Sequence, residues 1–523
     1  MSSIREAPRP RNSPRTTEDD GTWLSSEGPY LNLIKQSCAR QPNLELPDGR
    51  NRAVILCDRQ NIRASLFELG TENQISSPTE FPTFVDLQKH FKHPRLDACR
   101  RIYLVEGLNP QIVALLGEQL NVDPIFFVTH ERTSTYLRWP YEPNLAPCLP
   151  SLLDGGQSFT ASYYDVRVLS EQLGTFSVAC AESGRDALRT KLGKEWEPTV
   201  ILHRKCSFWK TIFTNEDDWA ALILCDPPFR QAHIWQKPSF IQEPWSLKTI
   251  HFSAPPFQGG YADFIPHPWT IHRASGPPRG SLFDDMVHYL TEYHNDISAE
   301  LSGLDFTVFA KKIIASHYLL LIEYHEALLS TMAFPLQRKD NFANIETTSL
   351  ESSWSNIQQL CSRIDRYIKD VSHIMLQLHI PFDNPCVPSA GTKPYTKWSQ
   401  SESDYQYIYM KLQSLRERAE FLSSSLTGVT GINGAARSIR EAKTIKTFTI
   451  VALIFIPLSF STSLFSMSDR YLPGEKNFGV FFAVALPLVV FIFVAILLFD
   501  LGYNENSSWR LETFTTRIWR SWF

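Results

Sequence analysis

The sequence predicts an α+β domain, then a bundle of long helices with a stalk, and two transmembrane helices at the C-terminal end. Three observations predict this order. Short β-like runs separated by polar turns fill much of residues 51–236. Long stretches with helical spacing of apolar residues follow from residue 281. Two long apolar runs then lie within residues 445–465 and 478–499.

The composition limits the classes of function. The chain has 523 residues, a formal net charge of −4 and nine cysteines. A slightly acidic chain lacks the basic surface that bulk nucleic-acid binding needs, so we expect no nucleic-acid partner. The scattered, odd-numbered cysteines predict reduced thiols in the cytosol rather than a disulfide framework. The sequence has no glycine-rich phosphate loop, nucleophile elbow or CxxC motif, so we expect no enzyme.

Residues 1–50 are predicted to be a disordered N-terminal segment. Their first half is rich in proline, arginine and serine, and it lacks the apolar core of a signal peptide. The arginines are typical of a mitochondrial transit peptide, but Pro8 and Pro10 would interrupt its helix, and Asp19 has the wrong charge. We therefore expect the plasma membrane or an endomembrane, with the mitochondrial inner membrane less favoured.

Residues 51–236 are predicted to form the α+β domain. Ile102–Val105 predicts a strand, and Asn109-Pro110 and Asp123-Pro124 each predict the start of a helix. Further strands are predicted in the runs SYYDVRVLS, GTFSVACAES, TVILHRKCSFWKT and WAALILC. The next residues, 237–280, are rich in proline, glycine and aromatic side chains, which predicts a linker.

Residues 281–444 are predicted to form the helix bundle and stalk. Helices are predicted over Ser281–Leu301, Leu304–Ala333 and Thr348–His379, and a last helix runs from near Asp404 into the first span. Apolar residues of this last helix lie alternately four and three apart, as in a coiled-coil seam: Ile408, Leu412, Leu415, Ala419, Leu422, Leu426 and Val429. Three glycines then interrupt the seam: Gly428, Gly431 and Gly434. They are compatible with a continuous stalk that has a flexible waist, or with two separate helices.

The two spans are predicted at residues 445–465 and 478–499, joined by an external loop at 466–477. The uncharged run Thr447–Phe465 has roughly 19 residues and rises by roughly 28 Å, close to the thickness of the hydrocarbon core. A pair of buried core helices is the alternative. Basic residues flank the spans on their outer sides: Arg437, Arg440, Lys443, Lys446, Arg510, Arg517 and Arg520. The positive-inside rule therefore predicts that both termini, including the tail at residues 501–523, are cytosolic.

Pro457 lies inside the first predicted span. A proline removes a backbone donor and frees the carbonyl one turn before it. The freed carbonyl is compatible with a simple kink or with contact to a hydrated pore. The hydroxyl side chains that follow are compatible with helix packing or with an aqueous path: Ser459, Ser461, Thr462 and Ser463.

With this architecture, the segment TIKTFTIVALIFIPLSFSTSLFSMS resembles the CorA-like divalent metal (magnesium) transporter superfamily, and most of all its divergent fungal CorA-like branch. The segments RIYLVEGLNPQIVALLGEQLNVDPIFF and WAALILCDPPF are similar to the family to a lesser degree. The resemblance implies a homopentamer in a lipid bilayer, in which the stalk and first span line a pore and the second spans form an outer ring. It also implies passage of divalent cations, Mg²⁺ by default, and no cofactor other than the transported ion.

The resemblance implies roles for individual residues. The family signature Gly-Met-Asn at the pore mouth corresponds to Ser466, Met467 and Ser468, where only the methionine is kept. The pore-lining positions correspond to Ala442, Ile445, Ile456 and Ser459, and the two isoleucines would form apolar rings that gate by dewetting. Asp469 and Glu475 in the external loop would concentrate cations, unless they are ordinary solvated loop charges. The sequence assigns no set of metal ligands.

Two functions therefore remain open. Mg²⁺ releases its water reluctantly, so a selective pore mouth needs acceptors for the hydration shell. A serine hydroxyl is a shorter acceptor than an asparagine amide and would leave a wider ring at Ser468. The main hypothesis is a CorA-like metal-ion transporter or channel with a homo-oligomeric pore. The alternative is a transport-inactive membrane sensor or scaffold with a degenerate signature.

Overall fold

The computed structural model describes sixteen segments of the chain, and all structural statements below concern these: residues 24–26, 28–37, 62–69, 75–93, 100–131, 156–169, 177–190, 198–213, 218–236, 246–251, 255–257, 280–294, 305–337, 347–383, 401–467 and 477–502. The chain divides into two compact units. Unit 1 comprises Met1–Asn341 and Glu351–Ser424, and unit 2 comprises Phe342–Leu350 and Ser425–Phe523.

Unit 1 is built on a ten-stranded sheet in the order β10-β9-β5-β6-β7-β8-β3-β1-β2, with β4 paired to β7 beside this path. The pairing of β3 with β8 is parallel, and the other pairs described are antiparallel. The strands are β1 (Arg63–Leu69), β2 (Thr79–Phe81), β3 (Arg100–Glu106), β4 (Ser158–Val168), β5 (Ser177–Cys180), β6 (Asp186–Thr190), β7 (Thr199–Ile212), β8 (Trp219–Cys225), β9 (Gln231–Gln236) and β10 (Ser246–His251).

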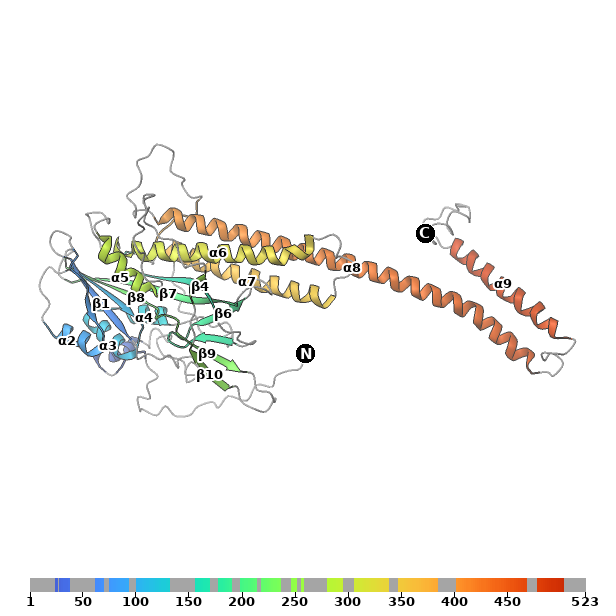
Figure 1. Ribbon diagram of the computed structural model, residues 1–523, viewed down its shortest axis with the longest axis horizontal. Coiled ribbons are helices and arrows are strands. Elements are labelled where there is room, and N and C mark those ends of the chain that lie inside the picture. The colour runs from blue at the N-terminus through green and yellow to red at the C-terminus, as the bar shows by residue number, and fades with distance from the viewer. Residues whose placement is uncertain are drawn as a thin grey trace, which may run out of the picture. The chain divides into compact units, whose positions relative to one another are not determined.

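Helices cover both faces of the sheet at β1, β3 and β8. Along β3, Ile102 and Leu104 belong to one apolar core, whereas Tyr103 and Val105 belong to another, because successive side chains of a strand point to opposite faces. Four short helices complete the second core: α1 (Pro29–Ser37), α2 (Phe84–Lys92), α3 (Pro110–Gln119) and α4 (Pro124–Glu131). The long helices lie on the other face (Figure 1). The predicted helix start at Asn109 is confirmed, since its side chain caps α3 by accepting from the Ile112 amide at 2.8 Å.

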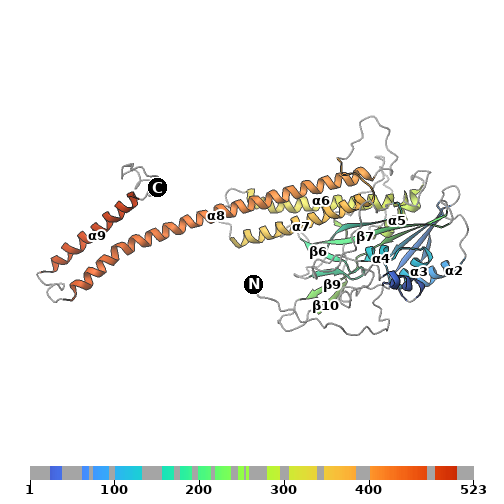
Figure 2. The ribbon, with the colours of Figure 1, turned by 180° about the vertical axis from the view of Figure 1, so that it is seen from behind.

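The long helices are not separate from the sheet. They are α5 (Leu282–Glu292), α6 (Val308–Gln337), α7 (Thr347–Gln377) and the start of α8 (Glu402–Phe465), and they share one core with β4, β7 and β8. Figure 2 shows α6 and α7 beside the first part of α8. The predicted division between an α+β domain at 51–236 and a bundle at 281–444 therefore differs from the structure, which places both in unit 1 and ends that unit at Ser424.

Polar contacts fix the long helices to β4 and to each other. The side-chain amide of Gln377 donates to the Thr160 carbonyl at 3.0 Å, and its oxygen accepts from the Thr160 amide at 2.7 Å. The Tyr318 hydroxyl on α6 donates to the Ser162 carbonyl at 2.7 Å. The Lys312 ammonium on α6 lies 2.8 Å from the Asp404 carboxylate on α8. Because the buried partners satisfy each other, these contacts hold the helices in one register against the sheet.

A buried polar cluster lies at the end of β8. The Asp226 carboxylate accepts from the Arg185 guanidinium, with one contact at 2.7 Å, and from the Lys205 amide at 2.6 Å. Burial opposes ionisation of this carboxyl, but the Arg185 charge outweighs it and lowers the pKa of Asp226 to about 2. His130 lies 2.8 Å from the Ser207 hydroxyl, and burial lowers the pKa of this imidazole to about 3.

Two segments contain more structure than the sequence predicted. Residues 29–37, within the N-terminal segment predicted to be disordered, form α1 and bury Tyr30, Leu31 and Ile34. Their spacing places them on one helix face, a signal that the polar and proline-rich residues before them concealed. Residues 246–251, within the predicted linker, form β10 and pair with β9. As an edge strand, β10 tolerates the prolines on either side of it.

The helix ends also differ in places from the prediction. The helix predicted over Ser281–Leu301 begins as expected, capped by Ser281, but ends at Glu292. The helix predicted over Leu304–Ala333 lies at Val308–Gln337, after a short 3₁₀ turn at Asp305–Thr307. The helix predicted over Thr348–His379 is confirmed as α7 to within two residues.

Unit 2 contains the second part of α8 and α9 (Phe478–Gly502). Helix α8 is continuous through its three glycines, so the alternative of two separate helices is wrong. A Cβ atom added at Gly428, Gly431 or Gly434 would meet no atom within 4 Å. By length and composition, α8 contains a segment apolar enough to cross a membrane, and Phe478–Val494 of α9 is a shorter apolar segment.

Candidate functional site

The four residues predicted to line a pore share one face of α8, which we call the conduction face. Ala442, Ile445, Ile456 and Ser459 fall within an arc of about 100° when each residue turns the helix by about 100°. Ile445 is 65% exposed and Ile456 is 67% exposed, and the other two are also exposed. The structure therefore brings all four to one uncovered surface.

Small and hydroxyl side chains fill the rest of the conduction face. Thr449, Ala452 and Ser463 fall within the same arc. The Thr449 hydroxyl donates to the Ile445 carbonyl at 2.8 Å, so its oxygen stays available as an acceptor. A surface of this kind combines two wide apolar positions with hydroxyl oxygens that can accept hydrogen bonds from hydrated ions.

The opposite side of α8 packs within unit 2. Pro457 and Ser461 are buried, and the Phe465 ring lies 5.9 Å from the Phe481 ring of α9 in an edge-to-face arrangement. These three residues are four apart and lie on the side of α8 away from the conduction face. On α9, Ala485 is 1% exposed, and small side chains such as this one and Ser461 allow close helix approach. Within the described residues of unit 2, α9 therefore covers one side of α8 and leaves the conduction face open.

Charged residues before the apolar segment are unevenly placed around α8. Arg437, Arg440, Lys443 and Lys446 fall outside the arc of the conduction face, whereas Glu441 falls within it, one turn before Ile445. The Arg437 guanidinium lies 2.9 Å from the Glu441 carboxylate, and both side chains are mostly exposed. The sequence reasoning missed Glu441, although its spacing of four from Ile445 was the available signal. An acidic group on this face attracts cations, and the four basic residues do not stand beside it.

The predicted signature is described only in part. The Ser466 amide donates to the Thr462 carbonyl at 2.9 Å and closes the last turn of α8, and Met467 is 85% exposed. Ser468, Asp469 and Glu475 lie outside the described residues. Helix α8 continues for two turns beyond Pro457, so this residue does not end the helix.

Within the described parts of both units, no three His, Cys, Asp or Glu side chains are placed to hold a metal ion. The conduction face itself carries one carboxylate and several hydroxyls, which suit a cation that keeps its water shell better than a dehydrated cation held in a ligand cage. The face is therefore a candidate path for ions and not a candidate catalytic centre.

Comparison with known proteins supports this assignment at the C-terminal end. Residues 389–500 match the family model described as CorA-like Mg²⁺ transporter protein, so the chain carries a CorA-like transporter domain there. The resemblance seen in the sequence is confirmed for this region. No curated protein sequence matches the chain.

Two solved structures are similar to the chain at low identity. The structure of the full-length CmaX protein has 12% identity and a TM-score of 0.36, with 85% of this chain and 99% of that chain covered. The CorA magnesium transporter from Methanocaldococcus jannaschii has 11% identity and a TM-score of 0.33, with 86% and 98% covered. Similarity at this level carries no conclusion about function, so the family assignment rests on residues 389–500.

Proposed function

We propose that this chain, with its CorA-like Mg²⁺ transporter domain at residues 389–500, is a membrane transporter or channel for divalent cations. Several copies of α8 surround a common pore, each turning its conduction face inward. The observation that carries the proposal is the open conduction face, with Ala442, Ile445, Ile456 and Ser459 exposed on the side of α8 that α9 leaves uncovered. The proposed topology has two spans, 445–465 and 478–499, with cytosolic termini and an external loop at 466–477.

The chemistry of the conduction face supports this proposal over a lipid-facing role. A surface in contact with lipid gains nothing from an acidic group and several hydroxyls, whereas a water-filled path does. The side chains of Ile445 and Ile456 form two apolar rings three turns apart, each able to close the path by dewetting. Hydroxyls at Thr449, Ser459 and Ser463 accept from the water shell of a passing ion. Mg²⁺ is the proposed default ion, with a pentamer as the proposed assembly.

Glu441 extends this path toward the cytosolic end of the span. In a symmetric assembly one carboxylate per copy forms a ring, and such a ring raises the local concentration of cations before the first apolar constriction. Asp469 and Glu475 are proposed to do the same at the external end. The Ser466-Met467-Ser468 triplet is proposed as the pore mouth.

Cysteine cross-linking in native-like membranes tests the enclosure. Single cysteines at Ala442, Ile445 or Ile456 are expected to join neighbouring copies, because they stand around one axis. A cysteine at Ile454, on the opposite side of α8, is the matched control and should cross-link at least severalfold less. The parent protein with its nine native cysteines sets the background. Equal yields from Ile454 and Ile445 would contradict an enclosed path.

Ion flux into proteoliposomes tests conduction itself. A panel of divalent ions should show uptake above that of empty liposomes, and Ile456→Ser should raise it severalfold, because a hydroxyl ring no longer excludes water. Leu458→Ser, outside the conduction face, is the matched control. Uptake equal to that of empty liposomes, from protein shown to be assembled, would favour the transport-inactive sensor or scaffold.

A further inference from the structure

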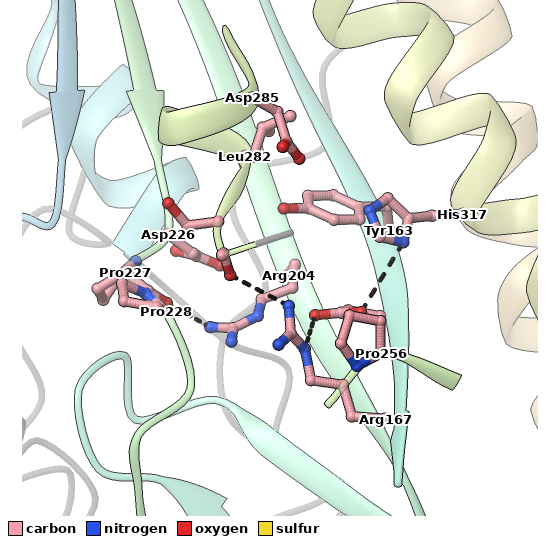
Figure 3. A pocket seen from close by; sticks show the side chains of 13 residues that line it. Tyr163, Arg167, Arg204, Asp226, Pro227, Pro228, Pro256, Leu282, Asp285 and His317 are labelled. Carbon is pink, nitrogen blue, oxygen red and sulfur yellow. Dashed lines mark hydrogen bonds and ion pairs between the residues drawn. The ribbon is translucent and has the colours of Figure 1, made fainter. Parts of the chain in front are cut away.

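A small enclosed cavity lies in unit 1, far along the chain from the apolar segments of α8 and α9. Strands β4 and β7, the start of α5 and helix α6 all contribute to its wall, together with the loop after β8 (Figure 3). Its volume is about 30 Å³, which is room for about two water molecules. The side chains that matter for its chemistry are Tyr163, Asp165, Arg167, Arg204, Asp285 and His317.

Arg204 is a buried cation without an ion pair. It is 4% exposed, and within the described part of the chain no carboxylate oxygen lies within 4.0 Å of its guanidinium. Its polar contacts are the Pro227 carbonyl at 2.7 Å and the Cys180 sulfur at 3.9 Å. Burying an unpaired charge is costly, so buried guanidinium groups normally have an anionic partner.

Tyr163 supplies a second unused donor. Its side chain is 4% exposed, and its ring stacks at a tilt on His317 with centroids 5.3 Å apart. Its hydroxyl has no hydrogen-bond partner among the described residues, and Figure 3 shows the hydroxyl end directed between Asp226 and Asp285 into the cavity. Two neighbouring tyrosines differ from it, since the hydroxyls of Tyr164 and Tyr318 have partners at 2.5 Å and 2.7 Å. A buried hydroxyl that aims into a cavity needs a ligand or a water to accept its proton.

The carboxylates around the cavity are already neutralised. Asp165 pairs with Arg167, whose guanidinium nitrogen lies 2.6 Å from the carboxylate, and Asp226 pairs with Arg185. These pairs leave Arg204 as the uncompensated charge. They also set an upper limit on the charge of an occupant, since a dianion would be repelled by three nearby carboxylates, those of Asp165, Asp226 and Asp285.

We propose that this cavity binds a small monovalent anion, of the size of chloride or acetate, between the Arg204 guanidinium and the Tyr163 hydroxyl. The anion compensates the buried cation and accepts from the tyrosine. The site does not depend on the proposed transport function, because no residue of the conduction face contributes to it.

Calorimetric titration of the full-length protein in detergent and in chloride-free buffer tests the proposal. Sodium chloride and sodium acetate should each bind saturably, with one displacing the other, while sodium sulfate and the bulky monoanion gluconate should not bind. Comparison of the chloride and acetate arms identifies which kind of monoanion the site prefers. Equal heats from all four salts, or saturable binding of sulfate alone, would overturn the proposal.

Two variants locate the site. Tyr163→Phe keeps the ring and removes one donor to a charged acceptor, so it should weaken anion binding by about tenfold. The matched control is Tyr318→Phe, which loses a hydrogen bond outside the cavity and should bind the anion within about twofold of the parent protein. Arg204→Lys keeps the charge but loses the planar fork, and should also weaken binding by about tenfold or more. Unchanged binding in both cavity variants would overturn the assignment, even if a general anion effect remained.

Discussion

The two parts of helix α8 have similar apolar periodicity but opposite environments. In unit 1, Ile408, Leu412 and Ala419 are fully buried against the chain's own α6 and α7. In unit 2, Ile432 is 70% exposed and Ile439 is 59% exposed, although both continue an apolar repeat. The difference teaches that a heptad seam does not by itself identify its partner. The first part of the seam is satisfied within one chain, and the second part leaves apolar surface for another copy or for lipid.

Truncation of one residue from each part should give the largest contrast. Leu412→Ala leaves a cavity in the shared core and should lower the free energy of unfolding of unit 1 by about 2–5 kcal/mol. Ile432→Ala removes an exposed side chain and should change it by less than about 0.5 kcal/mol. Urea unfolding, followed through the fluorescence of buried Trp219, measures both. Similar losses for the two variants would break the comparison.

Acid should weaken the buried part selectively. Burial lowers the pKa of His130 to about 3 and that of His325 to about 4, from an ordinary value of 6.5. Below pH 6.5 the unfolded chain binds protons that the folded chain does not, so the free energy of unfolding should fall by up to about 1.4 kcal/mol per pH unit for each histidine. The loss should extend from about pH 6.5 down toward pH 4, as measured by urea unfolding across this range.

His325→Phe tests the assignment of this slope. Its Nδ1 lies 2.8 Å from the Leu321 carbonyl within the same helix, so the variant loses one local contact and one titrating group. The slope between pH 6.5 and pH 4 should fall by about one histidine's share. His93→Gln, at an exposed position, should leave the slope unchanged. An unaltered slope in His325→Phe would exclude this residue as a contributor.

Replacing the three glycines should make the two parts of α8 more alike. Alanine fits at Gly428, Gly431 and Gly434 without a contact closer than 4 Å, and each change should add up to about 1 kcal/mol of helix stability. Amide hydrogen exchange across residues 425–440 should slow in the triple variant. Exchange across residues 405–419, which are held by the core, should not change.

The smallest effect is expected at Glu441. Glu441→Gln should lower divalent-ion flux by about two- to fivefold at low ionic strength and by less at high salt, because exposed charges are screened. Arg437→Gln is the matched control, since it removes the other member of the same ion pair and should not lower the flux. A loss of flux in Arg437→Gln equal to that in Glu441→Gln would assign the effect to the pair and not to the acid.

The sequence predicted elements whose signal is local. Strands β3, β7 and β8 were predicted from their apolar runs, and α3 from its capping asparagine and following proline. Helix α1 and strand β10 were missed, because each is short and lies among prolines or charges that dominate the local composition. The placement of the helices on the sheet could not be predicted either, since it depends on contacts between distant residues such as Gln377 and Thr160.

The same distinction applies to the two candidate sites. The four residues of the conduction face could be assigned together because they lie on one helix, where spacing determines the face. Glu441 was overlooked despite that spacing because it lies outside the apolar run. The anion cavity could not be predicted, because Tyr163, Arg204 and His317 come from three elements that only the folded chain brings together.

The contacts along β4 have a further consequence for how copies of this chain behave in solution. Strand β4 pairs with β7 on one side only, and an open strand edge is a template for aggregation. Gln377 occupies both backbone groups of Thr160 on that edge, the Tyr318 hydroxyl occupies the Ser162 carbonyl, and the Val168 amide donates to the Pro255 carbonyl at 2.9 Å. The helices and the loop thus act as a substitute strand, which protects the nascent chain from intermolecular β-pairing once they have docked.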